Sequence, residues 1–310
     1  WSESGVLKTG YIGLNRMMGV GGFLRGFFCN FGALTHNYKT GILLDMFMQI
    51  PRYNTPYMFD PSKKALMLRI SFENRPQQDL PDIYKKLVEM ATGQKVVKKD
   101  IDPREAARYI KEKFESKGYH IAWRYYSPND FTVDHLIAVL EEYEQKGYEI
   151  HCLNLDYLEL ICKSKSGKRE DLMITDSVER LRGYCYPRGI TVLNAHQLST
   201  EAQNIAREGG TNFVSRVAQG GWYMNCKSLH TKLDLEILMH IVKTADASYL
   251  TFARGKMRGE VDVPMKHRVF AYKFEEVGGI HEDYPSGECK AIYDLNSLNK
   301  PIAEADDDGW

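Results

Sequence analysis

The segment FGALTHNYKTG (31–41) places a lysine and a threonine, Lys39 and Thr40, where a phosphate-binding loop has them. The usual loop reads G-x-x-x-x-G-K-[ST]. Counting back from Lys39, Tyr38 stands at the second glycine position and Ala33 at the first. The motif is therefore incomplete by itself, since those glycines let the backbone approach a phosphate closely.

The residues on either side supply the context that a phosphate loop requires. FFCNFGAL (27–34) is an apolar run that predicts a buried strand. GILLDMFMQI (41–50) has apolar residues at helical spacing, and we expect Pro51 to end that helix. The helix N-terminus would offer free N–H groups to an anion, with Lys39 reaching the β- and γ-phosphates and Thr40 binding Mg²⁺. The alternative is a solvated lysine in a strand-to-helix loop.

Strands and helices alternate along the rest of the chain, which is typical of an α/β domain with a mostly parallel sheet. The pattern predicts further strands at 64–73, 120–126, 148–156, 189–199, 233–245 and 248–259. It predicts helices at 82–92, 103–116, 132–147 and 170–185.

Four polar residues fall at or just after the ends of these strands: Lys39, Glu73, Asp156 and Gln197. In parallel sheets, ligands bind beyond the carboxyl ends of the strands. An aspartate after the apolar strand IHCLNLD is typical of the Walker-B position, which holds Mg²⁺. A helix-capping or turn aspartate is the alternative for Asp156.

The segment DYLELI (156–161) resembles the D-Y-L-Q-L segment of DnaB-type replicative helicases, which have RecA-like ATPase cores. Other segments resemble parts of that family in order, over about residues 8–275. They are the threonine–glycine opening TGYIGLNRMMGVGGFLRG (9–26), the strand ending in the catalytic glutamate ISFEN (70–74), the γ-phosphate-sensing strand LNAHQLS (193–199) and the arginine-finger strand FARGKMRG (252–259). The helical segment 75–120 is variable and is not aligned.

The resemblance implies an ATP-dependent helicase with ATP and Mg²⁺ as ligands, and it assigns roles to residues. The implied catalytic residues are Lys39, Glu73, Gln197, Lys256 and Arg258, with Arg254 as the second possible register of the finger. The implied nucleotide-binding residues are Gly32, Ala33, Tyr38, Lys39, Thr40, Gly41 and Asp156, of which Thr40 and Asp156 bind the metal. Tyr38 departs from the family, because it replaces a glycine whose torsions a tyrosine resists.

Two polar segments, CKSKSGKRE (162–170) and REGGTNFVSRVAQGGWYMNCK (207–227), follow the strands that carry Asp156 and Gln197. Cations, backbone N–H groups and interleaved aromatics in loops suit sequence-independent binding of single-stranded DNA. The candidate DNA-binding residues are Lys163, Lys165, Lys168, Arg169, Arg207, Arg216 and Lys227. Solvated surface loops are the alternative.

Composition limits the classes of function. Lys+Arg and Asp+Glu are 41 each, so any DNA contact must come from local basic segments on a neutral body. The six cysteines form no C-x-x-C pair, which argues against a disulfide framework or a structural zinc site and favours a reducing cytoplasm, bacterial or phage-infected. No apolar run is long enough to span a membrane.

We therefore expect an ATPase domain at 1–275 and a C-terminal extension at 276–310 with an acidic tail, EADDDGW. The expected assembly is a homo-oligomer, a hexameric ring on single-stranded DNA. A primase, polymerase or loader could bind through the N-terminal region or the tail. The alternatives are a filament-forming recombination or repair ATPase and a non-hydrolysing DNA-binding scaffold, which Tyr38 motivates.

Overall fold

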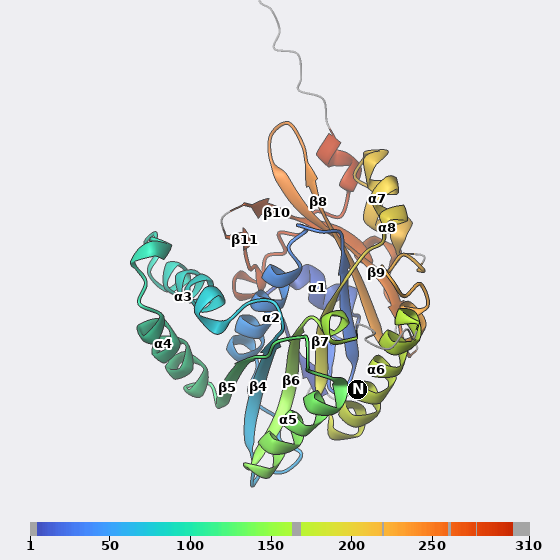
Figure 1. Ribbon diagram of the computed structural model, residues 1–310. Helices are drawn as coiled ribbons and strands as arrows, with labels where there is room; N and C mark the ends of the chain where they lie inside the picture. Colours follow the sequence, from blue (N-terminus) through green and yellow to red (C-terminus); the bar gives the residue numbers. More distant parts are fainter. Residues whose placement is uncertain (1–4, 163–168, 219, 260–261, 277, 300–310) are drawn as a thin grey trace, which may run out of the picture.

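A computed structural model describes residues 5–299, except 163–168, 219, 260–261 and 277. In this part of the chain, nine strands form a twisted sheet at the centre of the molecule, in the order β11-β10-β9-β8-β3-β7-β6-β4-β5 (Figure 1). The strands are β3 (Phe28–Ala33), β4 (Lys64–Ser71), β5 (Tyr119–Tyr125), β6 (Tyr148–Asp156), β7 (Thr191–Gln197), β8 (Leu235–Lys243), β9 (Ser248–Met257), β10 (Val269–Glu275) and β11 (Gly279–Ile280). A separate small sheet pairs β1 (Val6–Leu7) with β2 (Phe23–Leu24).

The six neighbouring strands from β8 to β5 all run parallel. At the other side of the sheet, β9 runs antiparallel to both β8 and β10, and β11 runs antiparallel to β10. The prediction of an α/β fold with a mostly parallel sheet is confirmed. Two edges result, and we call them the C-terminal edge and the N-terminal edge after the ends of the parallel strands.

Helices cover both faces of the sheet (Figure 1). Buried side chains of the first four helices join one apolar cluster, and those of α5, α6, α7, α8 and α9 join the cluster on the opposite face. The helices are α1 (Ile12–Met17), α2 (Lys39–Tyr53), α3 (Pro76–Thr92), α4 (Pro103–Glu115), α5 (Val133–Gln145), α6 (Glu170–Cys185), α7 (Thr200–Arg207), α8 (Phe213–Val217) and α9 (Leu229–Lys232). Helices α3 and α4 project at the left of Figure 1.

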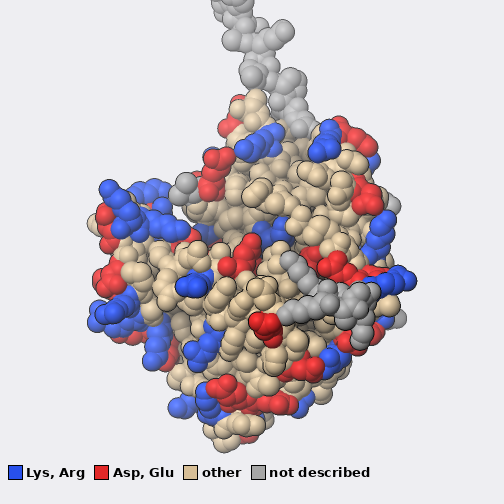
Figure 2. Space-filling model, viewed as in Figure 1, with Lys and Arg blue, Asp and Glu red and all other residues tan. Residues whose placement is uncertain are grey.

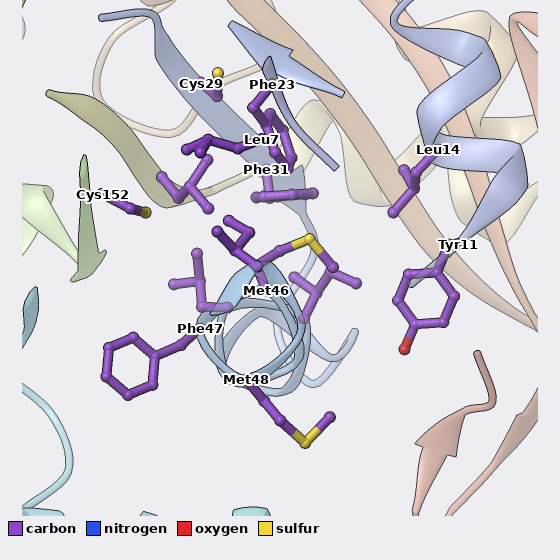
Figure 3. Packing of buried hydrophobic residues seen from close by; sticks show 14 of the residues in the cluster. Leu7, Tyr11, Leu14, Phe23, Cys29, Phe31, Met46, Phe47, Met48 and Cys152 are labelled. Carbon is purple, nitrogen blue, oxygen red and sulfur yellow. The ribbon is translucent and has the colours of Figure 1, made fainter. Parts of the chain in front are cut away.

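Strand β3 lies in the middle of the sheet and is buried along its whole length. Its side chains alternate between the two clusters, with Phe28 on one face and Cys29 and Phe31 on the other. Figure 3 shows Phe31 packed against α2, beside Met46 and Phe47 of that helix. The burial of both elements fixes the loop between them, which carries the phosphate-loop motif.

Three local expectations differ from the structure. Helix α2 continues past Pro51 to Tyr53, because a proline near a helix end removes a single backbone hydrogen bond there. Asn54 then ends the helix, and its side-chain Nδ2 donates to the carbonyl of Ile50 at 2.7 Å. Helix α8 lies inside the segment expected to be one long loop, and strands β10 and β11 were not anticipated.

The described residues after 275 pack onto the domain. Asp283 accepts hydrogen bonds from the backbone N–H of Ile12 at 2.7 Å and from the hydroxyl of Tyr272 at 2.9 Å. The acidic tail lies outside the described residues. Among the described helices, none is both long and apolar enough to cross a membrane.

Candidate nucleotide-binding site

The sheet brings the four strand-end residues predicted from sequence to one place. Strands β3, β7, β6 and β4 are consecutive neighbours, and in their registers Ala33 pairs with Gln197 and Ser71 pairs with Asp156. Glu73 follows Ser71 by two residues, and Lys39 follows Ala33 through the loop. The predicted phosphate-loop, Walker-B, glutamate and glutamine positions therefore share the C-terminal edge.

Lys39 is the first residue of α2, and its ammonium Nζ donates to the backbone carbonyl of Leu34 at 2.9 Å. The side chain thus folds back over the loop that it would share with a phosphate. Burial lowers the pKa of Lys39, and the negative charges of Glu73 and Asp156 oppose that effect. An incoming polyphosphate would replace the carbonyl as the partner of this cation.

Thr40 and Asp156 come together across the sheet edge. The Thr40 hydroxyl donates to Oδ1 of Asp156 at 3.4 Å, and Asp156 is fully buried. Mg²⁺ prefers oxygen ligands and is usually held by one or two protein groups together with substrate phosphates. This hydroxyl and carboxylate, at the N-terminus of α2, fit that requirement.

Tyr38 adopts the left-handed backbone conformation, with φ 63° and ψ 23°. His36, two residues earlier, also has a positive φ of 59°. A residue with a side chain is strained there by about 1–2 kcal/mol relative to glycine. The tyrosine therefore takes the backbone conformation that its position demands in spite of its side chain.

The Tyr38 side chain turns back over the first turns of α2 and is held there. Its hydroxyl donates to Oδ2 of Asp45 at 2.9 Å and accepts from Nζ of Lys86 at 2.9 Å. Its ring meets Phe274 edge-on, with centroids 5.1 Å apart. Asp45 is buried, which raises its pKa, and Lys86 beside it lowers that pKa.

Two glycines make room for this ring. A Cβ atom added to Gly41 would lie 2.1 Å from Tyr38 Cε2, and one added to Gly279 would lie 1.8 Å from the Tyr38 hydroxyl. Gly41 lies in the first turn of α2 and Gly279 in β11. A cavity of about 470 Å³ opens beside them, lined by Tyr38 and Thr40 among others.

Glu73 and Gln197 flank the phosphate loop from its two sides. The backbone N–H of Glu73 donates to the Ser71 hydroxyl at 3.2 Å, which fixes the turn after β4. Partial burial raises the pKa of the Glu73 carboxyl, and the charge of Asp156 raises it further. Nε2 of Gln197 donates to the hydroxyl of Thr35, in the loop, at 2.6 Å.

Sequence reasoning missed several residues of this edge. Arg69 of β4 is fully buried and contacts Asp156, while Asp45 and Lys86 hold Tyr38. Glu159, also buried, forms an ion pair with His196 at 3.4 Å. An arginine in the middle of the apolar strand KALMLRIS was a detectable signal; the others have none in the local sequence.

The arginine-finger candidates lie at the N-terminal edge, away from Lys39. Arg258 pairs through Nε with Oδ1 of the buried Asp234 at 2.6 Å, just before β8. Nζ of Lys256 donates to the carbonyl of Thr231. Arg254 points elsewhere: its Nη1 donates to the carbonyl of Met17 at 3.1 Å. Lys256 and Arg258 thus share one small region, from which Arg254 is separate.

The DNA-binding candidates are only partly described. Lys163, Lys165 and Lys168 lie outside the described residues. Each of the others is exposed and has a partner: Arg169 pairs with Asp171, Arg207 with Asn204, Arg216 with Glu208 and Lys227 with Glu201.

Two of these cations, Arg169 and Lys227, line one surface hollow of about 690 Å³ together with Ser199 and Asn225. The face drawn in Figure 2 mixes acidic and basic side chains, with Lys and Arg gathered over the projecting α3–α4 pair. No uniform basic face is therefore visible in this view of the described residues.

A strand–loop–helix that brings a lysine and a threonine to a buried aspartate, on a mostly parallel sheet, defines a P-loop ATPase fold of the RecA-like class. The chain belongs to the divergent DnaB-like ATPases, whose family model matches residues 1–307. No curated protein matches the sequence.

Solved structures share the fold at low sequence identity. One of them, a protein's ATPase domain, is 11% identical with a TM-score of 0.61, over 91% of this chain and 93% of that one. A DnaB-like replicative helicase, described with its interactions with primase, is 13% identical with a TM-score of 0.63. That match covers 88% of this chain but 62% of the helicase chain.

Proposed function

We propose that the protein is an ATP-dependent DNA helicase that assembles into a ring, a hexamer, and moves along single-stranded DNA while it hydrolyses ATP. Membership of the divergent DnaB-like ATPases supports this proposal. The observation that carries it is the gathering of Lys39, Thr40, Glu73, Asp156 and Gln197 at one edge of the sheet. A structural role alone requires no such combination.

In the proposed reaction, Lys39 leaves the Leu34 carbonyl and binds the β- and γ-phosphates of ATP, beside the free N–H groups of α2. Thr40 and Asp156 would hold Mg²⁺, which neutralises charge on the phosphates. The Glu73 carboxylate orients the attacking water and accepts its proton. The raised pKa of Glu73 suits a proton acceptor.

Gln197 would report the γ-phosphate. It bonds Thr35 of the phosphate loop and ends the strand that leads to α7 and α8. A γ-phosphate near Thr35 would compete for the Gln197 amide and so move the segment that follows. That segment carries Arg207, Arg216 and Lys227, the described DNA-binding candidates.

Arg258 and Lys256 would act on the nucleotide of a neighbouring subunit. Strand β3 separates the N-terminal edge from the C-terminal edge by about 16 Å, at about 3.3 Å per residue over five steps. Arg258 lies beyond the first edge, since its backbone N–H bonds the carbonyl of Asp234. A finger so placed cannot reach Lys39 of its own chain, whereas a second copy can bring the two edges together.

We further propose that partners of the replication machinery, a primase, polymerase or loader, bind through the N-terminal region or the acidic tail. The solved helicase described with primase is the relative that suggests the first of these. We also retain the division into an ATPase domain at 1–275 and an extension at 276–310, and a cytoplasmic site of action in a bacterial or phage-infected cell.

A non-hydrolysing scaffold is the second candidate, because one observation favours it. The Tyr38 ring covers Gly41, whose backbone N–H a bound phosphate would approach. If the ring stays there with nucleotide present, ATP could bind only weakly. Filaments of a recombination ATPase are a third arrangement of the same core, and electron microscopy separates them from closed rings.

The experiment that tests the proposal measures ATP hydrolysis with and without single-stranded DNA. We expect DNA-stimulated hydrolysis, and a fall of about 10²–10³-fold in Lys39→Ala, by analogy with the loss of one transition-state donor. Lys243→Ala is the matched control, since that lysine is exposed and pairs with Glu276. No hydrolysis by the wild-type protein, or normal hydrolysis by Lys39→Ala, would contradict the enzyme.

A further inference from the structure

Arg69 is a charged residue in the middle of an otherwise apolar strand, and its side chain is entirely buried. A guanidinium is costly to remove from water, by several kcal/mol, unless charges and hydrogen bonds compensate it. The partners of Arg69 therefore indicate what the residue does.

Those partners converge on the candidate site. Nη2 of Arg69 lies 2.7 Å from Oδ2 of Asp156 and 3.1 Å from Oδ2 of Asp79, and Nη1 donates to Oδ1 of Asn154 at 2.5 Å. The guanidinium also lies 5.1 Å from the centre of the Trp123 ring. One buried cation thus joins β4, β6 and α3.

The second partners of these residues extend the network to both sides of the site. Nδ2 of Asn154 donates to the carbonyl of Leu43 in α2 at 2.8 Å. Oδ1 of Asp79 accepts from Nδ2 of Asn74, which follows Glu73, at 2.9 Å. Arg69 therefore connects the helix of the phosphate loop with the turn that carries the glutamate.

The two oxygens of Asp156 have different partners. Oδ2 is bound by Arg69, and Oδ1 faces the Thr40 hydroxyl. One arginine between two buried aspartates also leaves a formal charge of −1 on the cluster. Only Oδ1 of Asp156 is then free for a metal, while the arginine offsets part of the charge that would repel a polyphosphate.

We propose that Arg69 is a positioning residue of the nucleotide site, a built-in cation that holds Asp156 in place and limits how strongly nucleotide binding depends on Mg²⁺. The inference rests on the proposed function. It adds a residue that acts through Asp156 and does not touch the substrate.

The chain offers a matched control in Arg25. This arginine is also buried in an ion pair, with Glu149 at 3.0 Å, but at the N-terminal edge. Its other guanidinium bonds go to the carbonyls of Gly189 and Tyr57. A purely structural arginine should behave like Arg25 in every measurement.

The test measures binding of a fluorescent ATP analogue to the full chain, in EDTA and across a magnesium titration. In Arg69→Met we expect binding in EDTA to weaken about tenfold, as removal of a unit charge one carboxylate away from the ligand implies. Magnesium should restore most of that loss, so the enhancement by Mg²⁺ grows about tenfold. Arg69→Lys should lie between Met and wild type.

Asp79→Asn gives the opposite sign, because it leaves the whole charge of Arg69 to Asp156. We expect tighter binding in EDTA and a smaller enhancement by Mg²⁺. This variant and Arg69→Lys decide the question if Arg69→Met does not fold. Arg25→Met should lower the melting temperature and leave the enhancement at the wild-type value.

The inference is wrong if Arg69→Met and Arg25→Met show the same enhancement by Mg²⁺. It is also wrong if Asp79→Asn changes the enhancement in the same direction as Arg69→Met. Lys39→Ala separates this failure from failure of the proposed function. If Lys39→Ala leaves analogue binding unchanged, the nucleotide site itself is wrong; if it removes binding while the Arg69 variants do nothing, only the role of Arg69 is wrong.

Discussion

The two edges of the parallel strands carry opposite kinds of charge. At the C-terminal edge, the single ammonium of Lys39 faces the carboxylates of Glu73 and Asp156. At the N-terminal edge, one buried carboxylate, Asp234, binds the guanidinium groups of both Arg182 and Arg258. Each edge thus has in excess what the other would use, and this complementarity is the reason to expect a catalytic site shared between two copies.

Removing the finger breaks the comparison most severely. Arg258→Ala should lower the turnover of ATP by about 10³-fold, the lower end of the range for arginine fingers. Mixing Arg258→Ala with Lys39→Ala subunits should restore part of the activity, since some interfaces then combine an intact finger with an intact Lys39. Two defects within one subunit could not complement each other.

Arg254→Ala distinguishes the two registers of the finger. Because Arg254 bonds the Met17 carbonyl, we expect a lower melting temperature and less than about tenfold loss of turnover. A loss as large as that of Arg258→Ala, together with rescue on mixing, would assign the finger to Arg254.

Acid should weaken the fold from both edges, because each buries a histidine. Burial lowers the pKa of His196, at the C-terminal edge, to about 4, and it lowers the pKa of His151 at the other edge. The unfolded chain takes up a proton below about pH 6.5 while His196 stays neutral, so stability falls as the pH drops from about 6.5 to about 4. His196 contributes up to about 3 kcal/mol to this loss.

His196→Gln should flatten that part of the pH dependence, measured by urea unfolding at pH 7 and pH 5. Glutamine keeps an amide that can donate to the Met224 carbonyl, which His196 contacts at 2.9 Å. The same slope in the variant and the wild type would show that His196 is not the group that titrates.

Tyr38 sharpens the comparison at the C-terminal edge. Tyr38→Gly should raise the affinity for nucleotide about tenfold, if the ring must leave Gly41 and is out of the way about one tenth of the time. The melting temperature should fall, because the contacts with Asp45 and Phe274 are lost. Tyr38→Phe keeps the ring and loses the hydroxyl bonds, so its gain in affinity should be smaller. Weaker binding in Tyr38→Gly would mean that the ring supports the nucleotide.

The smallest expected effect concerns DNA. Arg216→Ala and Lys227→Ala should each weaken binding of single-stranded DNA about threefold at moderate salt, and each should reduce the slope of log affinity against log salt by about 0.7. Lys146→Ala, at the end of α5, should change neither quantity. Equal effects of all three variants would show that the binding is non-local.

The sequence predicted the sheet and the strand-end residues because both depend on local patterns. Apolar runs such as FFCNFGAL define buried strands, and parallel strands bring their ends together without further information. The antiparallel hairpin of β10 and β11 was missed, since β11 has only two residues and its pairing partner is set by tertiary contacts.

The network around the site was beyond local reasoning for a different reason. Asp45 meets Tyr38 across two turns of α2, but Lys86 and Gly279 reach the same ring from other elements. Arg69 could have been noticed as a charge in an apolar strand, yet its partners Asp79 and Asp156 lie 10 and 87 residues away. Such contacts depend on how helices pack, which no local pattern specifies.

The fit of Tyr38 between Gly41 and Gly279 also constrains the order in which these positions can change. With alanine at either position, the ring loses its place and the hydroxyl loses Asp45 and Lys86. By single substitutions, the tyrosine is accessible only from an ancestor that already had both glycines. Conversely, once Tyr38 is present, Gly41 and Gly279 are locked. The effects of these three positions are therefore epistatic: Gly41→Ala should be deleterious beside tyrosine and tolerated beside glycine at position 38.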